Sequence, residues 1–223
     1  MQDPKTIAII MDGNRRWARK SNLPVIHGHR KGIETLIKIV KASKRKGIKR
    51  LVVFAFSTEN WSRQLLEVNG LMNLISFGTD TNLDELIENE VKLTFIGNID
   101  SLPSNQKKDI AKCIEDTKKF TSFNLVIGLN YGGHWDIVNS VKKIQYSKKN
   151  ISEKNLLRFS ELGDEDVEIF IRTGGEIRIS NFLLLNIAYS ELFFVDKLWP
   201  DFCESDLDNI LNEYKKRIRR FGK

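Results

Sequence analysis

The feature that most constrains the fold of this chain is a pair of short runs that are apolar at every position. Residues 7–11 read IAIIM, and residues 51–56 read LVVFAF. A strand that is apolar at both its odd and its even positions has to bury both faces, and such strands are typical of parallel sheets covered by helices on both sides. The two runs therefore predict a buried, mostly parallel sheet.

Helical patterns alternate with further strand-like runs along the rest of the chain. Strands are also expected at residues 91–96, 124–129, 167–171 and 192–195. Helices are expected from about 33 to the stop signal Gly47, from 65 to 90 with a break near Gly78, from 104 to 120, at 135–146, at 182–189 and from 204 onward. We therefore predict an α/β fold with a mostly parallel central sheet of about six strands flanked by helices. A single domain is expected over residues 1–223.

Composition excludes several classes of protein. No run approaches the roughly 18 consecutive apolar residues of a membrane-spanning helix. The first residues show no secretion-signal pattern, and Cys113 and Cys203 fit no metal-binding spacing, so reduced thiols in a cytoplasmic protein are expected. The net charge of +7 suggests an anionic partner, but does not distinguish nucleic acid, a membrane surface and a phosphorylated substrate.

Polar residues and glycines follow four of the predicted strands at the point where each strand ends. The segments are Asp12 to Trp17, Ser57 to Arg63, Asn130 to Gly133 and Arg172 to Glu176. Each segment alone is typical of a turn. In parallel sheets, however, ligands bind beyond the carboxyl ends of the strands, so the four segments are expected to meet at one edge. Their coincidence predicts a site there.

The residue types at this edge suit a diphosphate and a metal ion. Asp12 could hold Mg²⁺, which binds through one or two carboxylates, phosphate oxygens and water. Gly13 and Asn14 tolerate positive φ, which lets backbone N–H groups face an anion. Ser180 could cap the helix expected at 182–189, whose amino terminus would favour an anion. Four arginines carry forked donors that match phosphate: Arg16, Arg63, Arg172 and Arg178.

Motifs of other enzyme classes are absent from the sequence. There is no phosphate-binding G-x-x-x-x-G-K-[ST] loop, no G-x-G-x-x-G dinucleotide fingerprint, no zinc-binding pair and no G-x-S-x-G elbow. The aspartate-rich D-D-x-x-D pattern of helical prenyl synthases is also missing. Of the three histidines, His29 could face the same edge as Asp12, whereas His27 and His134 are expected to be structural or exposed.

Several blocks over nearly the whole chain resemble the cis-prenyltransferases, and specifically the bacterial undecaprenyl diphosphate synthases. The blocks are residues 11–17 (MDGNRRW), Gly28-His29, residues 55–63 (AFSTENWSR), 130–133 (NYGG), 172–182 (RTGGEIRISNF) and 199–202 (WPDF). The resemblance implies a cytoplasmic homodimer that lengthens an allylic, farnesyl-type diphosphate with isopentenyl diphosphate, with Z stereochemistry and Mg²⁺. The implied product is a long-chain polyprenyl diphosphate, in bacteria undecaprenyl diphosphate, the lipid carrier precursor for cell-wall synthesis. Peripheral contact with the inner face of the membrane is implied for product release, and no nucleic acid partner is expected.

The same resemblance assigns roles to individual residues. Asp12 and Glu191 are expected to bind the metal, and Asn60 to take part in the proton step. Because a neutral amide has negligible basicity, a diphosphate oxygen could be the final proton acceptor. The allylic site is expected to comprise Gly13, Asn14, Arg15, Arg16, Trp17, His29, Ser57, Thr58, Glu59, Asn60, Trp61 and Arg63. The isopentenyl site is expected to comprise Arg172, Arg178, Ile179 and Ser180.

Two positions depart from the family pattern, and two other functions remain open. Val25 replaces a usual arginine, a phosphate ligand, and Gln64 replaces the proline that usually follows Arg63. An apolar tunnel for the product is expected beside the sheet, bordered by a helix that carries Leu71, Leu74 and Ile75, although that face could equally be core. The alternatives are a non-catalytic partner subunit of the same fold and an RNA-binding protein that uses the basic tail.

Overall fold

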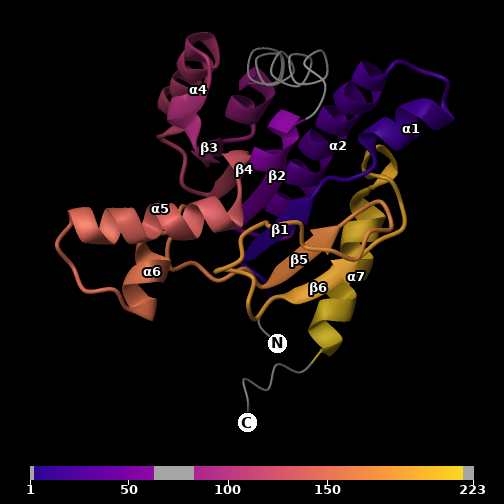
Figure 1. The fold of residues 1–223 in the computed structure, drawn as a ribbon. Helices are drawn as coiled ribbons and strands as arrows, with labels where there is room; N and C mark the ends of the chain where they lie inside the picture. The colour runs from indigo at the N-terminus through magenta and orange to yellow at the C-terminus, as the bar shows by residue number, and fades with distance from the viewer. Residues whose placement is uncertain (1–2, 63–82, 218–223) are drawn as a thin grey trace.

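The computed structural model describes residues 3–62 and 83–217, which form a parallel sheet with helices on both sides (Figure 1). The sheet has six strands in the order β3-β4-β2-β1-β5-β6, and every neighbouring pair is parallel. The strands are β1 (Thr6–Ile10), β2 (Arg50–Ser57), β3 (Val91–Ile96), β4 (Phe123–Tyr131), β5 (Ile169–Arg172) and β6 (Glu191–Phe194). The predicted fold class is confirmed.

Helices connect the strands and cover the sheet. They are α1 (Asn14–Lys20), α2 (Val25–Arg45), α4 (Ser104–Thr117), α5 (Gly133–Tyr146), α6 (Glu153–Phe159) and α7 (Glu204–Lys216). Three short 3-10 helices are η1 (Thr58–Ser62), η2 (Ile99–Ser101) and η3 (Trp199–Asp201). Residues 83–88 are helical as well, but the rest of the helix expected from 65, including Leu71, Leu74 and Ile75, lies outside the described residues.

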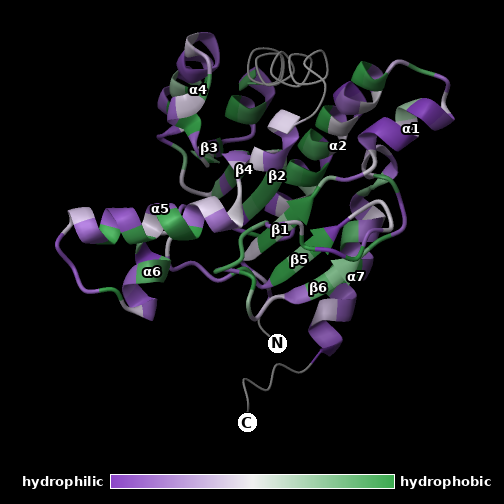
Figure 2. Cartoon of the chain, in the orientation of Figure 1, coloured by the Kyte–Doolittle hydropathy of each residue, from purple (hydrophilic) through white to green (hydrophobic). Residues whose placement is uncertain are grey.

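The two faces of the sheet pack into two separate cores, which explains the fully apolar runs. On β1, Ile7 and Ile9 join a cluster with apolar residues of α2 and α7, whereas Ala8 and Ile10 join a second cluster on the other face. All five residues of β1 are buried. The hydropathy colouring shows the central strands as the most continuously apolar part of the chain (Figure 2). Burial on both faces thus accounts for the pattern from which the sheet was predicted.

The prediction of a helix at residues 182–189 is wrong. This segment forms a series of turns, and Ser180, Asn181 and Leu183 have φ of 47°, 59° and 50°. An α-helix of L-residues requires negative φ, so Leu183 interrupts the expected helix, and Ser180 and Asn181 directly before it cannot begin one. Phe182 and Leu183 are fully buried in the second core instead. Tertiary packing therefore decides the conformation of an apolar segment whose composition favours a helix.

Candidate active site

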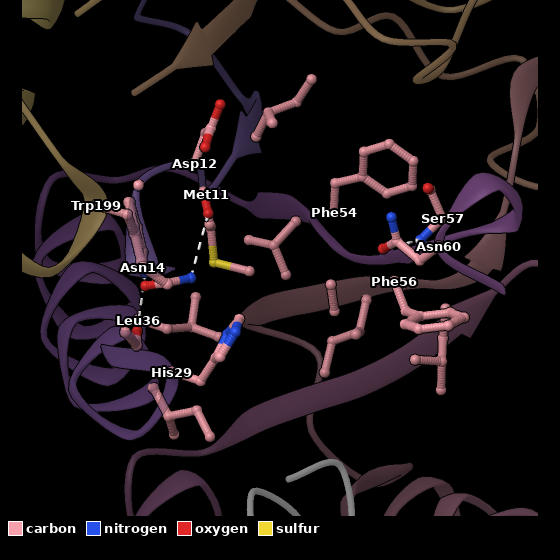
Figure 3. A pocket seen from close by; sticks show the side chains of 18 of the residues that line it. Met11, Asp12, Asn14, His29, Leu36, Phe54, Phe56, Ser57, Asn60 and Trp199 are labelled. Carbon is pink, nitrogen blue, oxygen red and sulfur yellow. Dashed lines mark hydrogen bonds between the residues drawn. The ribbon is translucent and has the colours of Figure 1, made fainter. Parts of the chain in front are cut away.

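A pocket of about 980 Å³ lies where the carboxyl ends of the central strands meet (Figure 3). Its polar lining comes from segments far apart in the sequence: Asp12, Asn14, Arg15, Arg16, Arg19, His29, Ser57, Glu59, Asn60, Arg172, Ser180 and Asn181. Its apolar lining comes from α2 and from strands β2, β3 and β4: Ile33, Leu36, Ile37, Val53, Phe54, Leu93, Phe95, Leu125, Ile127 and Leu129. A cavity with this division suits an amphiphile that has an anionic head and a hydrocarbon tail.

Asp12 follows β1 and is held by both its side chain and its backbone. Its Oδ2 lies 3.1 Å from Nη2 of Arg172, and its Oδ1 lies 3.1 Å from Nη2 of Arg16. Its carbonyl oxygen accepts hydrogen bonds from Thr173 Oγ1 (2.7 Å) and from the Trp199 backbone N–H (2.9 Å). The Asp12 side chain is 30% exposed, so this carboxylate is fixed in place but open to a ligand.

Two carboxylates line the pocket, Asp12 and Glu59, and Glu59 already accepts a hydrogen bond from Asn181. Among the described residues, no group of three or more His, Cys, Asp or Glu side chains is arranged to hold a metal. Mg²⁺ often binds proteins through only one or two carboxylates and takes its other ligands from substrate phosphates and water. Asp12 therefore fits a Mg²⁺ ion that arrives with a diphosphate, and does not fit a site made of protein ligands alone.

Arg172 ends β5 and connects Asp12 to the next segment of the chain. Its side chain is only 8% exposed. Its Nη1 donates to Ser180 Oγ (2.6 Å) and to the carbonyl oxygen of Arg178. Arg178 itself is exposed and forms an ion pair with Glu176 (2.6 Å). Ser180 caps no helix, because no helix begins there, so that part of the prediction is wrong.

The allylic-site candidates after β1 lie on α1 or directly before it, and no helix was predicted here from the sequence. Gly13 is the residue before this helix, with φ of 118°, and Asn14 is its first residue. The packing of α1 on α2 depends on Gly28, because a Cβ there would lie 2.1 Å from the carbonyl oxygen of Asn14. Arg15, Arg16 and His29 line the pocket beside this contact.

Trp17 does not line the pocket. Its Nε1 donates to Asp201 Oδ1 at 2.7 Å, which joins α1 to η3. Both residues belong to blocks that carried the family resemblance. The structure therefore gives Trp17 a packing contact, and its expected contact with substrate stays a prediction.

The segment after β2 folds as η1 and is held by three amide side chains. Asn60 Oδ1 accepts from the Ser57 backbone N–H (3.1 Å), and Asn130 Oδ1 accepts from Trp61 Nε1 (2.7 Å). Asn181 Nδ2 donates to Glu59 Oε1 (2.8 Å). No role was assigned to Asn130 or Asn181 from the sequence, although both lie in motif blocks and Asn130 begins one of the four segments expected at this edge. Arg63 and Gln64 lie outside the described residues.

Tyr131 takes no part in the pocket, although its block, residues 130–133, ends a strand at this edge. Its hydroxyl donates to Asp136 Oδ2 at 2.8 Å inside the second core. Burial raises the pKa of the Tyr131 hydroxyl, and the neighbouring Asp136 charge raises it further. Burial also raises the pKa of Asp136, more than its hydrogen bonds lower it. This pair therefore stabilises the junction of β4 and α5.

Glu191 lies at the opposite edge of the sheet from Asp12. It is the first residue of β6 and pairs with Ile169 at the start of β5, whereas Arg172 pairs with Phe194. Three residue steps along a strand cover about 10 Å, and two strand spacings add about 10 Å more. Glu191 Oε2 instead accepts from Arg217 Nη1 at 2.7 Å. Within one chain, the two expected metal ligands are not brought together.

Comparison with known proteins decides the family. The prenyltransferase family model described as undecaprenyl diphosphate synthase matches residues 10–222. An isoprenyl transferase from Staphylococcus saprophyticus is 46% identical, over 98% of this chain and 89% of that protein. A ditrans,polycis-undecaprenyl-diphosphate synthase ((2E,6E)-farnesyl-diphosphate specific) from Micrococcus luteus is 45% identical, over 99% of this chain and 92% of that protein. The chain belongs to the undecaprenyl diphosphate synthase family.

Solved structures agree with this membership. Lavandulyl diphosphate synthase from Lavandula x intermedia, in complex with dimethylallyl diphosphate, is 29% identical, with a TM-score of 0.94 over 99% of each chain. A probable undecaprenyl diphosphate synthase from Campylobacter jejuni is 30% identical, with a TM-score of 0.88 over 100% of each chain. As a member of the undecaprenyl diphosphate synthase family, the chain is a transferase.

The predicted family resemblance is thereby confirmed. None of the helices in the described part of this family member combines the length and the apolar character needed to cross a bilayer.

Proposed function

We propose that the chain is a cis-prenyltransferase that condenses isopentenyl diphosphate units onto an allylic, farnesyl-type diphosphate with Z stereochemistry. Its product is a long-chain polyprenyl diphosphate, undecaprenyl diphosphate, the lipid carrier precursor for cell-wall synthesis. The observation that carries this proposal is the shared pocket, in which an arginine-rich edge continues into an apolar chamber. Diphosphate chemistry can then take place at one end while a hydrocarbon chain grows into the other.

The side chains of the edge suit the departure of a diphosphate from an allylic carbon. This step leaves positive charge on carbon and adds negative charge to the leaving oxygens. Arg15 and Arg16 on α1 and His29 on α2 line the pocket and would bind the leaving diphosphate. A Mg²⁺ ion held by Asp12 would supply further stabilisation of that charge. Ser180 and Arg178, on the segment after β5, would hold isopentenyl diphosphate.

The proton released after the condensation needs an acceptor. Asn60 Oδ1 already accepts a hydrogen bond from the Ser57 backbone, and an amide has negligible basicity. We assign Asn60 to orienting the substrates. An oxygen of a bound diphosphate would take the proton, since it is anionic and lies beside the reacting carbons.

A homodimer is part of the proposal. Strand β6 is the outermost strand on one side of the sheet. Its Leu192 and Phe194 side chains are 39% and 36% exposed, and Tyr189, just before the strand, is 72% exposed. A second copy would cover these apolar side chains and the free edge of the strand. Within one chain, Glu191 lies at the amino ends of the strands and Asp12 lies at their carboxyl ends. The two could therefore bind one metal only if Glu191 comes from one subunit and Asp12 from the other.

No described feature favours the RNA-binding alternative. That alternative uses the basic tail, and the described lysines of the tail are paired with acids: Lys215 lies 2.9 Å from Asp3, and Lys216 lies 3.5 Å from Glu213. These lysines therefore do not form an open surface for a polyanion. The non-catalytic alternative is disfavoured because Asp12 and Arg172 are both present and joined at the edge.

The proposal is tested by incubating the protein with farnesyl diphosphate, radiolabelled isopentenyl diphosphate and Mg²⁺, and separating the products by chromatography. We expect a ladder of polyprenyl diphosphates that ends at one long product. Failure of any isopentenyl unit to be incorporated, by folded protein, would contradict the proposal and favour the non-catalytic subunit. Omission of Mg²⁺ with a chelator present is expected to abolish incorporation.

A further inference from the structure

Asn181 joins three segments that leave three different strands. It follows Ser180 on the segment after β5, and its side chain is half-buried. Its Nδ2 donates to Glu59 Oε1 on η1 (2.8 Å), and its Oδ1 accepts from the backbone N–H of His134 on α5 (2.9 Å). Its carbonyl oxygen accepts from the Gly133 backbone N–H (2.6 Å). One residue thus contacts the polar segments after β2 and β4 from the segment after β5.

We propose that Asn181 is a positioning residue that sets the separation between the two substrate-holding segments, η1 and the segment that carries Arg178 and Ser180. This inference rests on the proposed function. The condensation needs the allylic carbon of one substrate within reach of the double bond of the other, and a displacement of about 1 Å can cost about 100-fold in rate. Because η1 carries Asn60, which orients the substrates, and the other segment holds isopentenyl diphosphate, the contact between the two segments decides that distance.

The hydrogen bonds determine the orientation of the Asn181 amide. A backbone N–H can only donate, so the atom that faces His134 is the amide oxygen. The amide nitrogen then faces Glu59, whose ionised carboxylate can only accept. Burial raises the pKa of Glu59, but the hydrogen bonds from Asn181 and from its own segment outweigh burial and lower this pKa overall. Both polar atoms of the amide are therefore used, each with the partner that its chemistry requires.

Asparagine is also matched to the backbone at this position. Asn181 has φ of 59°, a left-handed conformation that asparagine adopts more readily than most residues. The segments around it are in close contact, because a Cβ on Gly132 would lie 2.5 Å from Thr58 Oγ1 and 3.1 Å from Asn181 Nδ2. Arg172 provides a second connection by bonding Ser180 on one side and Asp12 on the other. The bond from Arg172 to Ser180 and the bond from Asn181 to Glu59 hold the segment at two adjacent residues. Together they restrict its rotation as well as its distance from η1.

The test exchanges the donor and the acceptor of the bond between Asn181 and Glu59. Asn181→Asp keeps the shape and the contact with His134 but places two carboxylates opposite each other. Adding Glu59→Gln in the same chain restores one donor and one acceptor with the amide on the other side. The comparison set is wild type, Asn181→Asp, Glu59→Gln and the double variant, with Asn150→Asp at the exposed turn before α6 as a matched control.

For each variant, kcat and the KM of both diphosphates are measured, together with the melting temperature. We expect Asn181→Asp to lower kcat about 10- to 100-fold with little change in either KM, because the ligands of each diphosphate remain. The kcat of the double variant is expected to lie close to that of Glu59→Gln. Most of the loss of kcat seen in Asn181→Asp alone should therefore disappear. Asn150→Asp is expected to match the wild type.

Two outcomes would overturn the proposal: an unchanged kcat in Asn181→Asp, or a loss that Glu59→Gln does not relieve. If Asn181→Asp does not fold, Asn181→Gly replaces it, since glycine accepts the left-handed backbone and removes both side-chain bonds. Its loss of kcat should not be relieved by Glu59→Gln, and relief would count against the proposal. Absence of turnover in the wild type itself would refute the proposed function, which separates that failure from failure of the positioning role.

Discussion

Replacing Asp12 with alanine is expected to damage both catalysis and stability, for separate reasons. Catalysis should fall because Asp12 is the carboxylate at the edge that fits a metal held together with the leaving diphosphate. Loss of that stabilisation should raise the barrier by about 4 kcal/mol, on the order of 10³-fold in rate. The loss is measured as kcat for the condensation of farnesyl and isopentenyl diphosphates.

The stability loss follows from the surroundings of Asp12. Arg172 is nearly buried, its Nε has no hydrogen-bond partner among the described residues, and Asp12 is the carboxylate with which it forms an ion pair. Removing the partner of a buried charge-assisted hydrogen bond costs about 2–3 kcal/mol. Arg16 is 44% exposed, so its ion pair with Asp12 adds little. For a chain of this size, the melting temperature should fall by about 5–10 °C.

The two effects are separated by Asp12→Asn and by a surface control. Asp12→Asn still accepts a hydrogen bond from Arg172, so most of the stability should return while turnover stays low. Asp208→Ala removes a carboxylate that is 46% exposed and paired with Lys46, and should cost less than about 1 kcal/mol. Thermal unfolding and turnover are measured on all three variants. An unchanged melting temperature in Asp12→Ala would refute the structural part, and near wild-type turnover in excess Mg²⁺ would refute the metal assignment.

Three further predictions concern the allylic site, the α1–α2 contact and the dimer. Arg15 lines the pocket, so Arg15→Gly should raise the allylic KM about tenfold. Val25, at the start of α2, does not line the pocket, but the much longer side chain of Val25→Arg should reach the diphosphate and restore the KM. If Arg15→Gly leaves this KM unchanged and Val25→Arg does not lower it, Val25 is a neutral replacement. Gly28→Ala should lower the melting temperature and turnover together, because its Cβ would overlap the Asn14 carbonyl; calorimetry showing wild-type stability would contradict this. Light scattering should report a homodimer for the wild type and a monomer for Phe194→Glu on β6, and a monomeric, active wild type would exclude the dimer.

The sequence alone determined the sheet and the edge at which the site lies. Runs that are apolar at every position can only be satisfied by burial on both faces, and the expected strand at 91–96 coincides with β3. Parallel strands place their carboxyl ends at one edge, so Asp12, Ser57 and Arg172 could be grouped without coordinates. These predictions succeed because they depend on a short repeating pattern and on a topological rule, both of which are local in origin.

Only the tertiary structure decided which partners the side chains at that edge contact. Residues 182–189 are apolar enough for a helix, yet the segment forms turns, with Phe182 buried, Leu183 at a left-handed φ and Asn181 before it bonded to Glu59. Arg172 was expected to bind a substrate phosphate; it lines the pocket, and its nearly buried side chain also bonds to Asp12 and Ser180, which the sequence did not indicate. Glu191 was expected to bind a metal together with Asp12, but within one chain it lies at the other end of the parallel strands from Asp12. Several of these features depend on contacts between distant residues, such as Arg172 with Asp12 (160 positions apart) and Asn181 with Glu59 (122 positions apart). No local pattern in the sequence records the free energy of such contacts.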